Sequence, residues 1–263
     1  MAPSGIPALD TLTGGLPRGC LTEICGPASS GRTTILLTAL AAATRRGEYC
    51  AVIDASDALD PHSVAASGID LNRLLWVRCN ENSPQRHRAT EKNSIKNKGN
   101  EESECPISRA SFARDVGIYE QASFNFEKKK SGSSEHRLEQ VLRATDLLLE
   151  SGGFGLIILD LADIPPQSAR RIPLTTWFRF RRAVEHKPTI LLAIEHHPIA
   201  GSCSSLLLQL GIPSTRDFDC DSNYSTHVNL LCGLEINAEL IRSRLDRKPA
   251  RSVMFETKTA WVG

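Results

Sequence analysis

The sequence predicts an α/β fold with a mostly parallel sheet flanked by helices. Short apolar runs at Leu21–Cys25, Cys50–Asp54 and Leu156–Asp160 alternate with stretches of helical periodicity. This alternation is typical of a parallel sheet, because parallel neighbours need a long connection and a helix usually supplies it. After Gly211 the apolar runs are separated by turns alone, so we expect antiparallel strands at the C-terminal edge of the sheet.

Each further element has a signal of its own. Further strands are expected at 74–79 and 189–194 in the parallel part, and at 227–231 and 239–241 at the C-terminal edge. Apolar residues at helical spacing predict five helices. They are marked by Leu9 and Leu12, by the run from Thr33 to Arg46, by Asp60 as cap before Pro61, by the run from His136 to Gly152, and by Trp177 and Val184.

Length and composition set limits on the class of protein. The chain of 263 residues is 41% hydrophobic and 23% charged, which is typical of a soluble α/β domain with a sizeable core. The formal net charge is +1, so any DNA binding must come from a local basic patch and not from a global field. We expect no membrane span and no signal peptide, because no apolar run is long enough and the N-terminus has no charged or apolar leader region.

The cysteines also indicate a compartment. The eight cysteines form no C-x-x-C pairs, and several lie inside apolar strands. This pattern favours buried thiols in a reducing cytoplasm over a disulfide framework or a zinc site.

A change in composition divides the chain. Residues 80–135 are rich in Asn, Ser, Lys, Glu and Arg, with few aliphatic residues. Such a segment buries too little apolar surface to offset its ordering entropy, so we expect a mostly disordered insertion between core segments 1–79 and 136–263. Lys128, Lys129 and Lys130 in this segment could contact phosphates. The favoured alternative is a solvated loop, because charged runs usually face solvent.

The motif around which the chain is organised follows the first predicted strand. A small-residue turn links this strand to an apolar helix, and this strand–turn–helix context is typical of a phosphate-binding loop. Glycines allow the backbone to approach the phosphates, and the Thr33 hydroxyl is placed for Mg²⁺. An arginine occupies the usual lysine position, so a planar guanidinium group replaces the compact ammonium charge. The loop comprises Gly26, Pro27, Ala28, Ser29, Ser30, Gly31, Arg32, Thr33 and Thr34.

A carboxylate completes this candidate site. Asp160 ends an apolar strand later in the chain, where a carboxylate typically holds Mg²⁺ in phosphate-loop proteins. The alternative is a helix-capping aspartate. Thr33 and Asp160 together favour a magnesium–nucleotide site more than either residue does by itself.

These motifs resemble the core of the RecA recombinase family. The runs G-P-A-S-S-G-R-T-T, I-D-A-S-D-A-L-D-P and L-I-I-L-D carry the resemblance, which covers about residues 4–80 and 136–210 and is weaker over the C-terminal strands. It implies a RecA-like phosphate-loop ATPase core that binds ATP and Mg²⁺ and acts on single-stranded DNA as an oligomer or filament. Since the similarity begins almost at Met1, we expect the family's N-terminal polymerisation segment and C-terminal domain to be missing.

The resemblance also implies roles for residues outside the phosphate loop. Asp60 would lie near the adenine. The family's first DNA loop corresponds to residues 165–171 with Arg170 and Arg171, and the second to residues 198–205 with Gly201 and Ser202. Arg242 and Arg244 stand where the family has basic residues that reach the phosphates of a neighbouring subunit; the alternative is an exposed basic strand end.

Several positions depart from the family pattern and predict weak hydrolysis. Ser56 stands at the position of the glutamate that orients the attacking water, and its neighbour Asp57 need not point the same way. His196 replaces the glutamine sensor, and Ser63 replaces the aromatic residue that stacks on adenine. With Arg32 in place of lysine, no residue of this sequence is assigned as the catalytic base.

Three functions remain open at this point. The first is a divergent RecA-like protein that binds nucleotide and single-stranded DNA in DNA repair, homologous recombination or the SOS damage response. The second is a catalytically decayed relative of the ImuA/SulA-like accessory type, which keeps the fold for contacts with a repair polymerase or recombinase. The third, a small-molecule kinase, is disfavoured because nothing in the sequence resembles a lid with arginine clamps.

Overall fold

The computed structural model describes residues 1–79, 133–211, 233–244 and 251–258, all within one compact unit. Its strands form one sheet in the order β3-β2-β4-β5-β1-β6-β7-β8. The strands are β1 Leu21–Cys25, β2 Cys50–Asp54, β3 Leu74–Arg78, β4 Leu156–Asp160, β5 Ile190–Glu195, β6 Leu206–Leu210, β7 Gly233–Ser243 and β8 Arg251–Lys258. Strands β1 to β6 pair in parallel, while β7 and β8 pair antiparallel. The predicted fold class is therefore confirmed.

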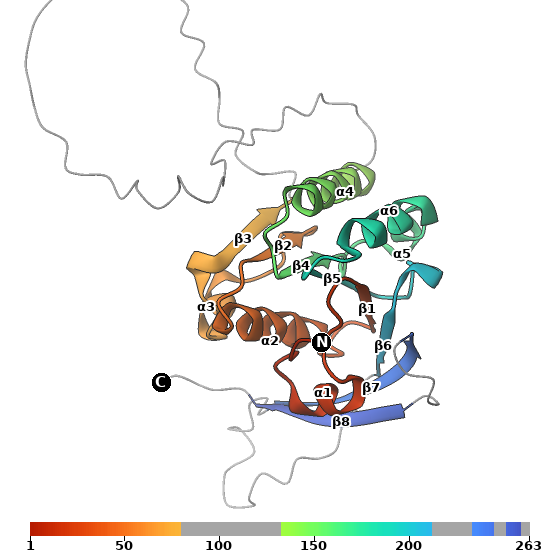
Figure 1. Ribbon diagram of the computed structural model, residues 1–263. Helices are drawn as coiled ribbons and strands as arrows, with labels where there is room; N and C mark the ends of the chain where they lie inside the picture. The colour runs from red at the N-terminus through yellow and green to blue at the C-terminus, as the bar shows by residue number, and fades with distance from the viewer. Residues whose placement is uncertain (80–132, 212–232, 245–250, 259–263) are drawn as a thin grey trace, which may run out of the picture. The chain divides into compact units, whose positions relative to one another are not determined.

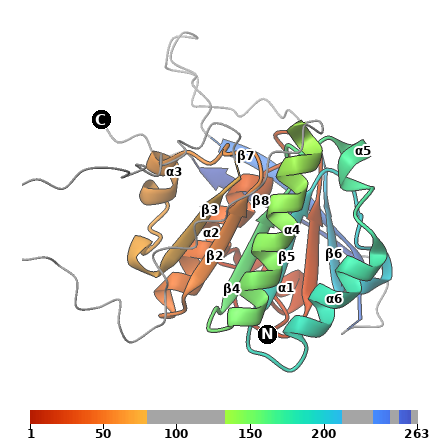
Figure 2. The same cartoon turned by 90° about the horizontal axis from the view of Figure 1, so that it is seen from above.

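Helices cover both faces of the parallel part (Figures 1 and 2). They are α1 Pro7–Thr13, α2 Arg32–Arg45, α3 Pro61–Ala66, α4 Ser133–Ser151, α5 Pro166–Ala169 and α6 Leu174–Val184, with 3₁₀ turns η1 Leu71–Arg73 and η2 Gly201–Cys203. Leu9, Leu36 and Val64 join α1, α2 and α3 to one core layer. Val141 and Trp177 join α4 and α6 to the layer on the other face. Strands β1 and β2 are buried along their whole length, because helices cover both sides of them.

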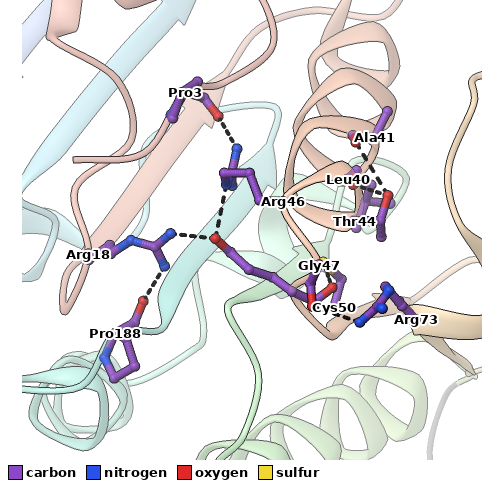
Figure 3. A network of polar contacts seen from close by, with 11 residues as sticks. Pro3, Arg18, Leu40, Ala41, Thr44, Arg46, Gly47, Cys50, Arg73 and Pro188 are labelled. Atoms are coloured by element: carbon purple, nitrogen blue, oxygen red, sulfur yellow. Dashed lines mark hydrogen bonds and ion pairs between the residues drawn. The ribbon is translucent and has the colours of Figure 1, made fainter.

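A polar network holds the edge of the sheet where the parallel strands begin (Figure 3). The Glu48 carboxylate accepts hydrogen bonds from Arg18 and from Arg46 at 2.9 Å. Arg18 also donates to the carbonyl of Pro188 at 2.8 Å, and Arg46 donates to the carbonyl of Pro3 at 3.0 Å. The network therefore joins the N-terminal segment, the end of α2 and the start of β5 at the edge opposite the phosphate loop.

The structure differs from the sequence-based prediction at several boundaries. Helix α4 begins at Ser133, so the last residues of the predicted insertion belong to this helix. The rest of the insertion and the strand expected at 227–231 lie outside the described residues. Strand β6 directly follows the loop expected at 198–205, and the strand expected at 239–241 is part of the longer β7. Within the described ranges, no helix is both long and apolar enough to cross a membrane.

Candidate nucleotide-binding site and neighbouring loops

The loop between β1 and α2 has the backbone of an anion cradle. Ser29 and Gly31 adopt left-handed φ angles of 61° and 90°, and the Ser30 N–H donates to the carbonyl of Pro27 at 3.3 Å. Left-handed residues among right-handed ones turn successive N–H groups toward one side, and the start of α2 adds partial positive charge there. The loop can therefore receive a phosphate group through its backbone.

Close packing fixes the start of this loop. A Cβ atom on Gly26 would lie 2.4 Å from the Ser30 Oγ and 2.9 Å from the Leu210 Cβ. Glycine is thus required at this position because β6 and the loop itself approach the backbone. Ala28, Ser29 and Thr33 remain exposed, so the outer side of the loop is accessible to a ligand.

Arg32, the first residue of α2, is turned inward. Its side chain is buried, with 7% of the residue exposed, and its Nη1 lies 3.5 Å from the carbonyl oxygen of Ala162. Among the described residues it forms no ion pair. Burial lowers the pKa of the guanidinium, and the charges of Asp160 and Asp163 partly offset this effect. A buried cation with one long hydrogen bond is incompletely compensated, and an anion bound at the loop would compensate it.

Asp160 and Asp54 end neighbouring parallel strands in register. Oδ1 of Asp160 accepts a hydrogen bond from the Ala162 N–H at 3.1 Å. Burial, with the charges of Asp54 and Asp163, raises the pKa of Asp160 to about 6. A carboxyl group whose ionised form is disfavoured by burial would be stabilised as a carboxylate by a cation at this edge.

Asp54 organises the loop after β2. Its Oδ1 accepts from the N–H groups of Ser56 at 3.3 Å and Ala58 at 3.1 Å, and its Oδ2 accepts from Leu59 at 3.1 Å. Asp54 is buried, with 1% exposed. It therefore shapes the segment that carries Ser56, Asp57 and Asp60, a role that the sequence analysis did not assign.

The residues on this loop have separate partners. Asp57 has a left-handed φ of 58° and forms an ion pair with Arg78 of β3, so its carboxylate is directed to the sheet edge. Asp60 caps α3, accepting hydrogen bonds from the N–H and the hydroxyl of Ser63 at 2.8 Å each. The predicted cap is confirmed, while the predicted proximity of Asp60 to an adenine stays a prediction.

The two predicted DNA loops lie beyond β4 and β5. Arg170 is exposed at the end of α5, and Arg171 forms an ion pair with Glu135 of α4. Arg170 also lines a small cavity with His196, whose pKa is lowered by partial burial and by the positive charge of Arg32. Arg170 and His196 therefore meet at the carboxyl edge of the sheet, where parallel α/β folds bind ligands.

The predicted second DNA loop and the predicted intersubunit arginines lie together. Arg242 donates to the carbonyl of Gly201 and, at 3.0 Å, to the hydroxyl of Ser204. Arg244 donates to the carbonyl of Ser202. Both arginines thus hold the η2 turn of the same chain, so any contact with the phosphates of a neighbouring subunit would require them to release it.

Two buried carboxyl groups beneath the second loop were missed by the sequence analysis. Oε1 of Glu23 on β1 accepts from the N–H groups of Ile199 at 2.9 Å and Ala200 at 2.7 Å. Glu195 at the end of β5 is 1% exposed, and within the described part of the chain neither of its carboxyl oxygens has a hydrogen-bond partner. Burial, with the nearby charge of Glu23, raises the pKa of Glu195 well above its ordinary value. The available sequence signal was a glutamate within one apolar run, at Glu23, and directly after another, at Glu195.

Comparison with known proteins finds relatives of the N-terminal part of the chain, which contains the candidate nucleotide-binding loop. Residues 1–89 match the RecA N-terminal domain. Protein RecA of Cutibacterium acnes is 51% identical over 75 residues, covering 28% of this chain and 22% of that protein. Protein RecA of Nostoc punctiforme is 52% identical over 73 residues, covering 27% of this chain and 20% of that protein. The chain thus spans about a fifth of the length of these curated relatives. The phosphate loop and the Asp54 loop lie in a region that is related to the RecA N-terminal domain.

Proposed function

We propose that the chain binds ATP with Mg²⁺ at residues 26–34 and acts on single-stranded DNA as a RecA-like protein in DNA repair, homologous recombination or the SOS damage response. The relationship of residues 1–89 to the RecA N-terminal domain supports this role. The observation that carries the nucleotide site is the buried, incompletely compensated guanidinium of Arg32, the first residue after the loop between β1 and α2. A triphosphate supplies the negative charge that this arrangement lacks.

The residues present suit a magnesium nucleotide. Mg²⁺ usually takes one or two protein oxygens and completes its shell with phosphates and water. Thr33, which is exposed, and the Asp160 carboxylate at the end of β4 would be these ligands. When bound, Mg²⁺ neutralises charge on the phosphates. The backbone of residues 26–34 would orient the phosphates, and Asp60 would lie toward the base.

Single-stranded DNA would follow the carboxyl edge of the sheet. Arg170 and Arg171 in one loop would neutralise phosphates, and Gly201 and Ser202 in the other would allow the backbone of the strand to approach closely. Release of Arg242 and Arg244 from η2 would free them for the phosphates of a nucleotide in a neighbouring subunit. The chain would then self-associate or join a recombinase partner.

Ser56 favours a second candidate, an accessory protein of the ImuA/SulA-like type that binds a translesion polymerase without fast hydrolysis. A serine hydroxyl at position 56 is not basic enough to activate water by itself, and Asp57 is paired with Arg78, so neither residue is placed as a general base. A DNA-stimulated ATPase assay separates the two candidates. Turnover that rises with single-stranded DNA supports the first, and no turnover despite nucleotide binding supports the second.

Thermal unfolding with a series of ligands tests the nucleotide site. A ligand that binds the folded state raises its stability by mass action, by about 2.7 kcal/mol at a hundredfold excess over Kd. We expect the melting temperature to rise with Mg-ATP, to rise less with Mg-ADP and to stay unchanged with adenosine. Equal responses to ATP and adenosine would contradict recognition of the phosphates.

A further inference from the structure

Two glutamates lie on neighbouring strands inside the core layer that α4 and α6 cover. Glu23 of β1 is opposite Ala193 of β5, so Glu195 lies diagonally across the strand pair from Glu23. Both side chains point to the same face of the sheet as Ala193, because alternate residues of a strand share a face, and Ala193 belongs to that core layer. Glu23 is 0% and Glu195 is 1% exposed. Two carboxyl groups are therefore removed from water together.

The two carboxyl groups have unequal partners. Oε1 of Glu23 accepts hydrogen bonds from the N–H groups of Ile199 and Ala200, and these bonds hold the loop at residues 198–205 against β1. Within the described residues, Oε2 of Glu23 and both carboxyl oxygens of Glu195 have no hydrogen-bond partner. A carboxylate is the better acceptor for two N–H groups, so Glu23 is the member of the pair that carries the charge. The arrangement therefore suits one carboxylate and one protonated carboxyl group.

The groups that surround Glu195 do not compensate a negative charge on it. Among the described residues Glu195 forms no ion pair, and burial with the charge of Glu23 raises its pKa well above the ordinary value. The charged or titratable groups on the elements packed around the pair are the buried thiol of Cys25 opposite Glu195 on β1, Arg170 of α5, His196 and His197 after β5, and Arg181 of α6 and Arg244 after β7, which both act on Cys203 in η2. An ionised Glu195 would thus be a second buried negative charge beside Glu23.

We propose that Glu23 and Glu195 form a proton-dependent switch that controls the loop at residues 198–205. While Glu195 holds a proton, Glu23 is the single charge beneath the loop and binds its backbone. Loss of this proton to water leaves two negative charges in the core, and hydrating them requires the loop to leave Glu23 and expose Ala200. Residue 195 lines a cavity with room for about one water molecule, which gives the proton a route out. The switch concerns the loop and not its ligand, so it does not depend on the proposed function.

Hydrogen exchange of the full chain without ligands, resolved to the amides of Ile199 and Ala200, tests the switch. Protection factors remove the intrinsic effect of pH on exchange. They should fall as pH rises above about 4.3, by up to about tenfold per pH unit, because opening of the loop releases one proton. The fall should end at the pKa that Glu195 has under the closed loop. The amides of β4, in the centre of the sheet, should be protected more strongly at every pH, because they exchange only when more of the chain unfolds.

Three variants complete the experiment. Glu195→Gln keeps the shape and cannot ionise, so protection of the loop should stay at its acidic value across the series. Glu23→Gln should lower protection even at mildly acidic pH, since a neutral amide oxygen is the weaker acceptor. Glu185→Gln, at an exposed position, is the control and should behave as the wild type.

The wild type alone can overturn the proposal, even if a variant fails to fold. Protection of Ile199 and Ala200 that does not change with pH would show that no proton controls the loop. Equal protection of the loop and β4 amides would show that the loop opens only when the whole chain unfolds. A fall with pH that persists in folded Glu195→Gln would assign the proton to another group and would also overturn the switch.

Discussion

Ile236 of β7 fills the space that a side chain on Gly31 of the phosphate loop would need. A Cβ atom on Gly31 would lie 2.1 Å from Cδ1 of Ile236, and the Gly31 backbone has a φ of 90°. The phosphate loop is therefore supported by a strand from the C-terminal part of the chain. The shape of the candidate nucleotide site depends on this antiparallel strand as well as on the region related to the RecA N-terminal domain.

This relationship predicts coupling between the two positions. Gly31→Ala should lower the free energy of unfolding by about 1–3 kcal/mol, through overpacking and an unfavourable φ. Ile236→Ala should cost about 2–5 kcal/mol through the cavity that it leaves. The double variant should lose less than the sum, because shortening Ile236 removes the close approach. Urea unfolding of the four proteins measures this, and strict additivity would show that Ile236 does not restrict Gly31.

Much of the fold could be predicted because its signals are local. Strands β1, β2 and β4 are continuous apolar runs, and the Gly26–Gly31 spacing marks the turn before α2. Strand β6 was missed although the apolar run L-L-L-Q-L that forms it directly follows the small-residue loop. No strand was predicted at β8, because its burial depends on pairing with β7 and on packing against α1.

The contacts of the site depend on tertiary structure and could not be predicted from spacing. The pairing of Arg171 with Glu135 and the binding of Arg244 to η2 join residues that are far apart in the sequence. The sequence shows the glutamates Glu23 and Glu195 within or next to apolar runs, but it does not show that their carboxyl groups are buried. The loop after β5 folds back onto the Glu23 carboxylate, and the sequence alone does not give this contact.

Arg170→Ala with Arg171→Ala should weaken binding of single-stranded DNA and reduce its salt dependence. Each lost phosphate contact lowers the slope of log affinity against log salt by about 0.7. The exposed pair between Arg171 and Glu135 is worth little, so it should not prevent Arg171 from reaching DNA. Fluorescence anisotropy across a salt series measures the slope. Arg143→Ala is the matched control, and a slope unchanged in the double variant would remove this loop from the DNA site.

Ser56→Glu combined with Arg32→Lys should raise DNA-stimulated ATP hydrolysis. A positioned general base contributes roughly 10²–10⁴ in rate. Ser56 is half-buried on the loop around Asp54, so a longer side chain can extend from it without entering the core. Phosphate release with single-stranded DNA is the readout. Fast hydrolysis by the wild type would contradict the expectation of weak turnover, and no gain in the double variant would show that more of the site has diverged.

Glu195→Gln should make stability less dependent on pH. The pKa of Glu195 is raised in the folded state, so the folded chain holds a proton that the unfolded chain loses above about pH 4.3. Its contribution to stability therefore falls as pH rises from there toward the folded pKa. Urea unfolding at mildly acidic and mildly alkaline pH should show a smaller decrease in the variant than in the wild type. Glu185→Gln, at an exposed position, is the control, and equal decreases in all three proteins would refute a titrating role for Glu195.

Calorimetric titration of Mg-ATP into the wild type, Arg32→Ala and Arg45→Ala tests the nucleotide site most directly. Both arginines belong to α2, but Arg32 is buried at the phosphate loop and Arg45 is exposed in the last turn. Loss of a charge-assisted hydrogen bond to phosphate should cost about 1.5–3 kcal/mol, or roughly 10- to 150-fold in Kd. The account predicts this loss in Arg32→Ala and an unchanged Kd in Arg45→Ala. Saturable binding of equal affinity in all three proteins, or no binding by the wild type, would contradict it.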